Sequence, residues 1–451
     1  MSKAQLNELE SLQKQFCAQR GQREIDMAVA DMRYALIEAM MKQCVKKSDS
    51  ETSVSDRIDM IVTNKYLGIP VFFLILFLMF IVTFGPIGEG LKGWVETLIN
   101  DVLAANLLVA LTSMAVAPWA LDLVNTVIGG VGSVLSFMPQ IMLLFLFLSV
   151  LEDSGYMSRA AFLMDGMLRK IGLNGKAFIP MLMGFGCTVP AVMASRVLEH
   201  EQDRKMTILL IPFMSCGAKL PVYALFAGIF FPEHSGVAIF SMYVLGILVA
   251  IGCGFLLRHT VFKENESTFI LELPPYRIPS FQVTMIHMWQ KAKGFLIKAG
   301  TIIFSMTVLL WVLTNFSFTL QMVADPTSSI LGTIGRLIAP LLIPLGFGHW
   351  QSAIALISGL IAKESVVSSM AVMYNVGNVS QLSGVLTRVF TPASAIAFMT
   401  FVLLYAPCVA AISAIHSEAG SWKYTLKSMG FQISVAYCVS FVVYHVVSLF
   451  I

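Results

Sequence analysis

Charge is scarce in this sequence. Asp, Glu, Lys and Arg together make up 13% of its 451 residues, whereas hydrophobic residues make up 57%. The mean hydropathy is +0.78. A soluble chain of this length needs many more polar side chains to cover its surface. The scarcity of charge therefore excludes an ordinary soluble domain and predicts an integral membrane protein.

Motifs for phosphate binding and hydrolysis are also lacking. No G-x-x-x-x-G-K-[ST] phosphate loop occurs, and the string at Gly172–Lys176 has the wrong spacing. Neither a G-x-S-x-G nucleophile elbow nor an H-E-x-x-H zinc helix is present. We therefore expect no enzymatic activity in this chain, and we expect no nucleic-acid partner.

The cysteines do not have the spacing of a disulfide framework, and most of them lie in apolar surroundings. We therefore expect free thiols rather than an oxidised scaffold. Residues 1–60 are polar, so no secretory signal peptide is expected at this end of the sequence.

Long apolar runs occupy most of the chain after this polar part. A bilayer core is about 30 Å thick, so a helix needs about 20 apolar residues to cross it. Runs of sufficient length are Ile69–Pro86, Met206–Phe231, Gly236–Leu257, Phe295–Leu313, Ala393–Ala414 and Ser428–Ile451. Shorter or punctuated runs are Phe137–Leu151, Lys176–Val197 and Leu337–Ile361, and Val102–Ala120 fits a span or an interfacial helix. We predict an all-α fold with about eight to ten transmembrane helices, because only helices satisfy their backbone in so apolar a setting.

The polar N-terminal part predicts soluble helices rather than spans. Apolar residues recur at helical spacing in residues 6–16 and again in residues 25–40, and a polar linker follows. We predict soluble helices and linker over 1–57, a first transmembrane repeat over 58–260, a loop over 261–294 and a second transmembrane repeat over 295–451. Lys and Arg gather before the first span and in that loop, so both segments are expected on the cytoplasmic side.

The two halves of the membrane region resemble each other weakly. Gly184-Phe185-Gly186-Cys187 in the first half corresponds to Gly346-Phe347-Gly348-His349 in the second, and an Ile-Pro pair precedes each. Each is followed by an apolar span with a cysteine near its middle, Cys216 or Cys408. Spans broken by glycine and proline at matching positions are typical of secondary transporters. We predict two gate-like repeats with broken helices, and chance recurrence of Gly-Phe-Gly is the alternative.

Cys187 and Cys216 are the strongest candidate metal ligands. Cys187 stands within G-F-G-C-T-V-P, and Cys216 stands between Pro212 and Pro221. Glycine and proline break the helix there, and such breaks persist in a membrane only where they line a cavity or are buried in protein. Thiolate sulfur suits a soft or borderline first-row cation. Cys408, after a proline, is an intermediate candidate, and plain apolar packing is the alternative for free cysteines.

Charged side chains near the spans are further candidates, because an ionisable group in a membrane faces a cavity or a partner by default. Glu152 and Asp153 end one apolar run, and Lys363 precedes Glu364 where another span should still be in the bilayer. A cation entrance and an interfacial ion pair are equally supported for Glu152 and Asp153. The predicted metal site comprises these two carboxylates, Glu364 and the three cysteines. Secondary candidates are Met193, Met214, Ser215, Lys219 and His349, the last because it replaces Cys187 in the second repeat.

These stretches resemble the ferrous iron transport protein B family along nearly the whole chain. The resemblance is carried in the first half by L-E-D-S-G-Y-M-S-R-A-A-F at 151–162, G-F-G-C-T-V-P-A at 184–191 and P-F-M-S-C-G-A-K-L-P at 212–221. In the second half it is carried by G-F-G-H-W-Q at 346–351 and A-K-E at 362–364. The family often has Asn in place of Thr188 and Arg in place of Lys219, and neither change removes a thiol.

The resemblance implies uptake of Fe²⁺ across the bacterial inner membrane by a multi-pass protein whose N-terminus is cytoplasmic. It also implies a GTPase and a helical regulatory domain ahead of the membrane part, and residues 1–47 look like the end of that helical domain. GTP and Mg²⁺ would then bind only to the GTPase, in cis or as a separate polypeptide, and no permanently bound cofactor is expected. The implied partners are Fe²⁺, the lipid bilayer, this GTPase and small soluble accessory proteins, with a homo-oligomer left open.

Two other functions fit the same residues. Gate-type repeats resemble segments of nucleoside-related permeases, and in such a transporter the cysteines would only pack around a polar and aromatic pocket. A membrane anchor that docks a GTPase is the third hypothesis, although an anchor needs neither intramembrane thiols nor intramembrane charge.

Overall fold

The computed structural model describes residues 25–44, 54–64, 66–114, 116–261, 275–319, 321–323, 326–374, 376 and 379–450. The chain splits into two compact units, Met1–Asp59 and Met60–Ile451. Helix α2 (Ile25–Cys44) lies in the first unit and agrees with the apolar spacing of that stretch, and α3 (Val54–Val62) follows it in the chain. The helix predicted over residues 6–16 and most of the predicted linker lie outside the described residues.

Helices account for the described secondary structure, apart from one isolated antiparallel bridge between Phe316 and Met322. The predicted all-α fold is therefore confirmed. Over the described ranges, six helices are long and apolar enough to cross a membrane, and the number rises to eight if each of two bent helix pairs is one span. Eight is the lower end of the range expected from the sequence.

The first half of the second unit contains α4 (Gly68–Phe84), α5 (Pro86–Thr97), a π-helical stretch (Leu98–Ala104), α6 (Ala105–Ser113), α7 (Pro118–Ser136), α8 (Met138–Asp153), α9 (Tyr156–Ile171), α10 (Phe178–Gly186), α11 (Thr188–Ala194), α12 (Glu201–Leu210), α13 (Leu220–Phe230) and α14 (Ser235–Thr260). Between α8 and α9 the chain bends by 84°. Gly155 makes this bend with φ +80°, a left-handed conformation that only glycine adopts without strain.

The second half contains α15 (Phe281–Asn315), α16 (Ile330–Leu342), α17 (Trp350–Ile361), α18 (Ser365–Met373), α19 (Val379–Val389), α20 (Pro392–Leu404), α21 (Val409–Ala419) and α22 (Trp422–Phe450). Helix α15 begins inside the segment that we predicted as a loop. Its first turns bury Thr284, Met288 and Ala292, and α15 packs against α8. An apolar face of this kind explains why these residues are helical although the segment also carries lysines.

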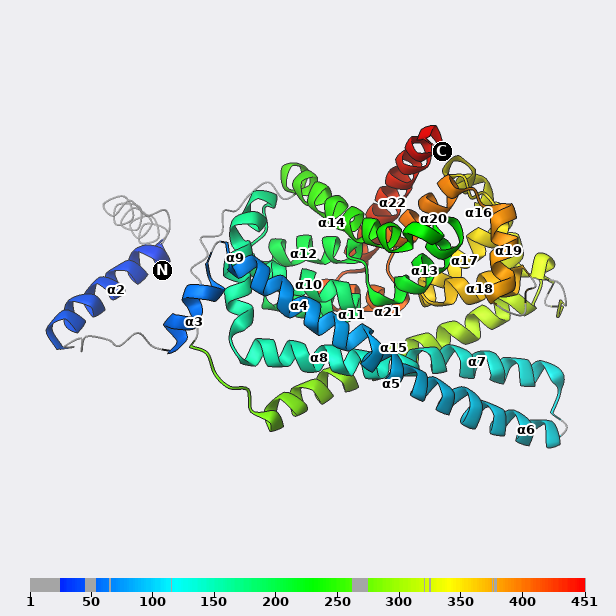
Figure 1. The fold of residues 1–451 in the computed structure, drawn as a ribbon, viewed down its shortest axis with the longest axis horizontal. Helices are drawn as coiled ribbons and strands as arrows, with labels where there is room; N and C mark the ends of the chain where they lie inside the picture. Colours follow the sequence, from blue (N-terminus) through cyan, green and yellow to red (C-terminus); the bar gives the residue numbers. More distant parts are fainter. Residues whose placement is uncertain are drawn as a thin grey trace, which may run out of the picture. The chain divides into compact units, whose positions relative to one another are not determined.

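Two series of helices follow the same order in the chain. Helix α9 is followed by the short hairpin α10–α11, the broken span α12–α13 and the long helix α14. Helix α16 is followed by the hairpin α17–α18, the broken span α20–α21 and the long helix α22. Helix α19 is an addition in the second series. Figure 1 shows α9 and α16 at opposite ends of the second unit, so the two short hairpins reach its middle from opposite sides.

Backbone angles at the breaks give the correspondence between the two series. Cys187, between α10 and α11, has φ −152° and ψ 130°, and Ala362, between α17 and α18, has φ −143° and ψ 126°. Cys216 has φ −81° and ψ 160°, and Cys408 has φ −61° and ψ 157°. Cys187 therefore corresponds to Ala362 and not, as the Gly-Phe-Gly strings indicated, to His349. His349 lies one helix earlier, directly before α17.

The two series are interlocked. Helix α11 packs against α21 and α13 packs against α18, so each hairpin contacts the broken span of the other series. Their apolar core is shared: the rings of Phe226 and Phe398 lie 5.0 Å apart, and both are fully buried. At one edge Arg196 donates two hydrogen bonds, of 2.6 and 2.7 Å, to the buried carboxylate of Glu418. Neither series can shift without disturbing the packing of the other.

A surface ion pair lies at the base of the first hairpin. Lys176, before α10, has its Nζ 2.8 Å from Glu199, which lies between the hairpin and α12. The hydrogen bond from Lys176 lowers the pKa of the Glu199 carboxyl. Both groups are accessible to water, which screens the attraction, so we assign the pair little stability.

Prolines explain two of the helix breaks. A proline has no N–H to donate to the carbonyl four residues earlier, and its ring collides with that carbonyl. Pro190 thus leaves the carbonyl of Gly186, the last residue of α10, without its helical donor. Pro407 does the same to the carbonyl of Leu403, in the last turn of α20. Each break leaves backbone carbonyls without their helical donors in an apolar setting, where an unpaired polar group is costly.

Two buried lysines supply the missing donors. Lys219 is 3% exposed and donates from Nζ to the carbonyls of Pro212, Met214 and Leu403, at 3.2, 3.1 and 2.7 Å. Lys363, also 3% exposed, donates to the carbonyl of Ala406 at 2.9 Å. Its ammonium also lies 3.2 Å from the centre of the Tyr405 ring, which attracts a cation. Lys219 therefore connects the broken span of the first series to that of the second.

Replacing this connection by an apolar side chain of similar length should destabilise the protein. Lys219→Met leaves three buried carbonyls without their common donor, and each unpaired group costs about 1–3 kcal/mol. We expect the melting temperature in detergent to fall by several degrees relative to Lys427→Met, an exposed position on α22. Lys219→Arg keeps a donor-rich cation and should lose much less. Equal melting of the two methionine variants would contradict the role assigned to Lys219.

Candidate functional site

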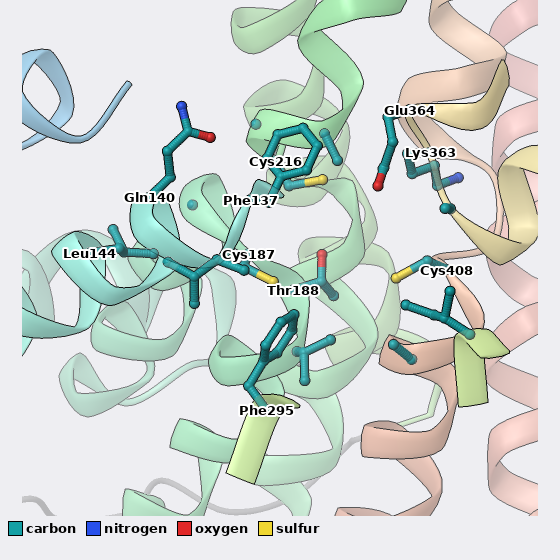
Figure 2. Close-up of a pocket in the computed structure, with 18 of the residues that line it drawn as sticks. Phe137, Gln140, Leu144, Cys187, Thr188, Cys216, Phe295, Lys363, Glu364 and Cys408 are labelled. Atoms are coloured by element: carbon teal, nitrogen blue, oxygen red, sulfur yellow. The ribbon is translucent and has the colours of Figure 1, made fainter. Parts of the chain in front are cut away.

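One cavity lies where the helix breaks meet. It has a volume of about 110 Å³, and its walls come from α8, from the breaks of both series and from α15. The residues that carry polar or sulfur atoms into this wall are Gln140, Cys187, Thr188, Cys216, Lys363, Glu364 and Cys408, and most of the remaining wall is apolar. Figure 2 shows these side chains around one space. A few polar side chains that meet in a cavity between apolar helices are the usual setting of a ligand site.

Three of the predicted ligands are cysteines that the fold brings to this cavity. Cys187 follows α10, Cys216 precedes the turn into α13, and Cys408 precedes α21. All three are free thiols. In Figure 2 their sulfur atoms face the same space from different sides. Each thiol lies at a break for the same reason: the extended backbone there turns the side chain away from the helix and into the cavity.

Glu364 adds a carboxylate to the same wall. It follows the second hairpin's break and stands directly before α18. Figure 2 shows its carboxylate directed toward the space between the cysteines. The sequence therefore predicted four residues that do meet: Cys187, Cys216, Cys408 and Glu364 all line one cavity.

In the part of the chain that the structure describes, these four residues do not form a ready-made metal-binding cage. Over the ranges it describes, no group of three or more His, Cys, Asp or Glu side chains is close enough to hold a metal ion. The thiols thus surround the cavity without converging on one point in this conformation. They can offer an ion one or two sulfur contacts at a time, together with oxygen from neighbouring groups.

Glu152 and Asp153 are not brought to the cavity. They lie at the end of α8, where Glu152 accepts a hydrogen bond of 3.0 Å from Lys291 and Asp153 accepts one of 3.2 Å from Thr284. His287 Nδ1 lies 3.8 Å from Asp153. All three partners belong to the first turns of α15, so these contacts favour the ion-pair interpretation over a cation entrance at this position.

The secondary candidates also lie outside the described cavity wall. Met193 and Met214 pack in the apolar cores, and Ser215 donates a hydrogen bond of 3.4 Å to the Tyr223 hydroxyl. His349 is exposed before α17. Lys219 is occupied by three backbone carbonyls. Local sequence could not distinguish these residues from wall residues, because a position beside a break does not fix the direction of the side chain.

Gln140 was missed by the sequence reasoning. It lines the cavity from the first turn of α8 and is 2% exposed. The signal was present, because Gln140 is an amide inside the otherwise apolar run Phe137–Leu151. Reasoning that considered only ionisable groups and thiols passed over it.

Comparison with known proteins follows the same division of the chain. The family model described as "Gate: Nucleoside recognition" matches residues 134–230 and again residues 296–422. The family model described as "Ferrous iron transport protein B C terminus" matches residues 239–291. The two matches to the first model cover the helix breaks of both series but end before the long helix α14 and at the first residue of the long helix α22. No solved structure matches the chain.

Several curated proteins are similar over nearly the whole chain. The Fe(2+) transporter FeoB of Staphylococcus aureus strain COL is 43% identical over 448 residues, which are 99% of this chain and 67% of that protein. The Fe(2+) transporter FeoB of Methanocaldococcus jannaschii is 38% identical over 433 residues, 93% of this chain and 63% of that protein.

A third relative has a different architecture. The Fe(2+) transport protein A/Fe(2+) transporter FeoB fusion protein of Porphyromonas gingivalis is 37% identical over 483 residues, 95% of this chain and 56% of that protein. The chain spans between about half and two thirds of the length of these three relatives. Its extent of similarity and the order of its matched segments show that it belongs to the ferrous iron transport protein B family.

Proposed function

We propose that this chain carries Fe²⁺ across a bacterial inner membrane, through the cavity between its two helix series. The observation that carries the proposal is the convergence of Cys187, Cys216, Cys408 and Glu364 on one small cavity among apolar helices. An ionisable carboxylate is costly in a membrane unless it serves a cation or a partner, and three thiols share the cavity with this one. The names of the related proteins supply the identity of the cation.

The chemistry of the wall suits Fe²⁺ better than the abundant hard cations. Sulfur ligands prefer soft or borderline metals, whereas Mg²⁺ takes oxygen ligands in near-ideal octahedral geometry and loses its water reluctantly. In a cavity of about 110 Å³ lined by thiols and a carboxylate, we expect a cation to exchange part of its hydration shell for these side chains. Partial dehydration therefore selects against Mg²⁺ at the point where the thiols can replace water for Fe²⁺.

Loose placement of the thiols suits transport. An ion must bind well enough to enter and weakly enough to leave. In the described part of the chain, no cluster holds three or more charged or sulfur ligands around one point. The ion would therefore be passed between thiols that project from opposite helix series, rather than be held in a closed cage.

Basic residues give the proposed orientation. Arg169 and Lys170 end α9, Arg258 at the end of α14 donates to the carbonyl of Arg169 at 2.8 Å, and Lys291 lies beside the end of α8. Positive residues favour the cytoplasmic side. Helix α4 begins on the same side, because Gly68 lies against Leu163 of α9. We therefore place the N-terminal part of the chain in the cytoplasm.

Partners beyond the ion belong to the proposal as well. GTP and Mg²⁺ would act through a GTPase domain supplied in cis or in trans, and the fused protein A of the Porphyromonas gingivalis relative favours a small accessory protein. No resident cofactor is proposed, and a homo-oligomer is left open. The thiol-lined cavity disfavours a mere membrane anchor for a GTPase, which would have no use for it.

A nucleoside transporter is the second candidate, favoured by the description of the Gate model. Pockets for small organic ligands usually measure about 300–1,000 Å³. The cavity between the helix series holds about 110 Å³ and presents three thiols. Its size and its sulfur atoms favour a single partly hydrated cation.

The thiols should be necessary for uptake. In proteoliposomes under reducing conditions, we expect Cys187→Ser/Cys216→Ser to lower ⁵⁵Fe²⁺ uptake at least about tenfold, which corresponds to ~1.4 kcal/mol. Hydroxyl oxygen replaces sulfur at nearly the same volume, so packing changes little. Cys253→Ser, on α14 and outside the cavity wall, is the matched control and should transport normally. Normal uptake by the double variant would refute the thiol path, and absence of uptake by the parent chain calls for the GTPase to be added.

Other divalent cations should compete with Fe²⁺ for uptake in proportion to their affinity for sulfur ligands. Unlabelled Co²⁺ and Zn²⁺ should inhibit ⁵⁵Fe²⁺ uptake near equimolar concentration, because both accept thiolate ligands. Mg²⁺ in about hundredfold excess should not inhibit, because it retains its water. Uridine and adenosine should have no effect. Inhibition by a nucleoside together with indifference to Co²⁺ and Zn²⁺ would favour the second candidate.

A further inference from the structure

Thr188 brings a hydroxyl without a partner to the cavity. The residue is 6% exposed and belongs to the cavity wall. Its Oγ1 makes no hydrogen bond to another described residue, and it is not one of the unpaired side-chain oxygens that the described part of the protein seals from solvent. Because Thr188 lies in the wall, the surface that this oxygen keeps faces the cavity.

The break between α10 and α11 explains why the hydroxyl is free. Inside a helix, a threonine hydroxyl can donate to the carbonyl four residues earlier, as Thr307 does to Ile303 at 2.8 Å. For Thr188 that carbonyl belongs to Gly184 in α10, on the other side of the extended backbone at Cys187. Thr188 is the first residue of α11 and has therefore lost its local acceptor.

The hydroxyl enters the cavity beside a thiol. Thr188 follows Cys187 directly, and consecutive Cα atoms are about 3.8 Å apart, so both side chains reach the wall from neighbouring points of the backbone. Figure 2 shows Thr188 between the sulfur atoms of Cys187 and Cys408, with its oxygen directed into the space that these thiols share with Cys216 and Glu364.

Oxygen ligands are few in the described wall. Gln140, Thr188 and Glu364 are its oxygen-bearing side chains, and the amide oxygen of Gln140 is sealed from solvent. The hydroxyl of Thr188 and the carboxylate of Glu364 are then the side-chain oxygens that can meet an ion there. An unpaired hydroxyl in an apolar bundle is costly, and native proteins retain few such groups without a reason.

The chemistry of a hydroxyl fits a partly hydrated borderline cation. Its oxygen has lone pairs for the ion itself, and it can also accept a hydrogen bond from a water that the ion retains. Sulfur alone favours softer ions, whereas a mixture of sulfur and oxygen suits a borderline ion such as Fe²⁺.

We infer that Thr188 is a further cation-binding residue of this cavity, whose hydroxyl contacts the ion directly or through one of its waters. The inference deepens the proposed function and rests on it. In a purely structural role, Thr188 would contribute only the packing of its methyl group and would leave the affinity for the ion unchanged.

The test removes the hydroxyl and keeps the shape of the side chain. In ⁵⁵Fe²⁺ uptake by proteoliposomes under reducing conditions, Thr188→Val should raise KM about tenfold and leave Vmax within about twofold, because a contact with a charged ligand is lost. Thr188→Ser keeps the hydroxyl and should keep KM within about twofold of the parent. A structural role predicts the opposite order, with a normal valine variant and an impaired serine variant.

Stability provides a second readout. Because the hydroxyl has no partner within the described protein, its replacement by a methyl group costs no hydrogen bond. Thr188→Val should therefore melt in detergent at or above the melting temperature of the parent. A variant that keeps its stability and loses affinity separates binding of the ion from folding.

Thr207 provides the matched control. It is fully buried on α12, and its Oγ1 also lacks a partner among the described residues. It lies outside the cavity wall. Thr207→Val makes the same chemical change away from the cavity and should keep the parent KM.

The outcomes distinguish the two levels of the proposal. An unchanged KM in Thr188→Val, or an equal rise in Thr188→Ser, while Cys187→Ser/Cys216→Ser is inactive, overturns the role of Thr188 and leaves the thiol path standing. If the valine variant does not fold, Thr188→Ala compared with Thr188→Ser decides in the same way, since these two differ only in the hydroxyl. Uptake that does not depend on the thiols overturns the proposed function, and the inference about Thr188 falls with it.

Discussion

The structure depends on one constraint, which is that a backbone carbonyl released inside an apolar bundle must find a donor. The helix breaks release such carbonyls, and water is not available to satisfy them. Lys219 answers this need at Pro212, Met214 and Leu403, and Lys363 answers it at Ala406. A lysine is suited to the task because its ammonium donates three hydrogen bonds and its long stem is apolar. Removing either lysine would leave these carbonyls without a donor or would draw water into the breaks.

The same breaks determine where the functional groups lie. A continuous helix turns its side chains outward in succession, whereas the extended residues at Cys187, Cys216 and Cys408 leave the helical path at the centre of the bundle. Because the two helix series reach the middle from opposite sides, their breaks meet and enclose a common space (Figures 1 and 2). Lys363 also belongs to the wall of that space. A divalent cation needs compensating negative charge there, which Glu364 and thiols that lose their protons on binding the ion can provide.

How much the sequence could predict follows from the range over which each feature acts. Glycine and proline act locally, so the breaks and three of the thiols were predictable, as was the carboxylate of Glu364. Long-range packing decides the rest: the correspondence of Cys187 with Ala362 depends on backbone angles, and His349 was misplaced because Gly-Phe-Gly recurs at a different turn. The sequence could not show which partners Glu152 and Asp153 have, because Lys291 and Thr284 belong to α15, far along the chain. The setting of Gln140 depends on a long-range contact, the hydrogen bond that its Nε2 donates to Glu89, 51 residues earlier in the chain.

Interlocking of the two series explains how a small cavity can serve movement across a membrane. Helix α11 contacts α21, and α13 contacts α18, so a shift of either hairpin displaces the broken span that carries a thiol of the other series. Lys219 adds a polar connection between the two broken spans through Leu403. The two hydrogen bonds from Arg196 to Glu418 join the two series at one edge of the same arrangement. Movement at one side is thus transmitted to the ligands by packing and by shared hydrogen bonds. An ion that satisfies thiols of both series at once would favour the arrangement in which they approach, and its departure would release them.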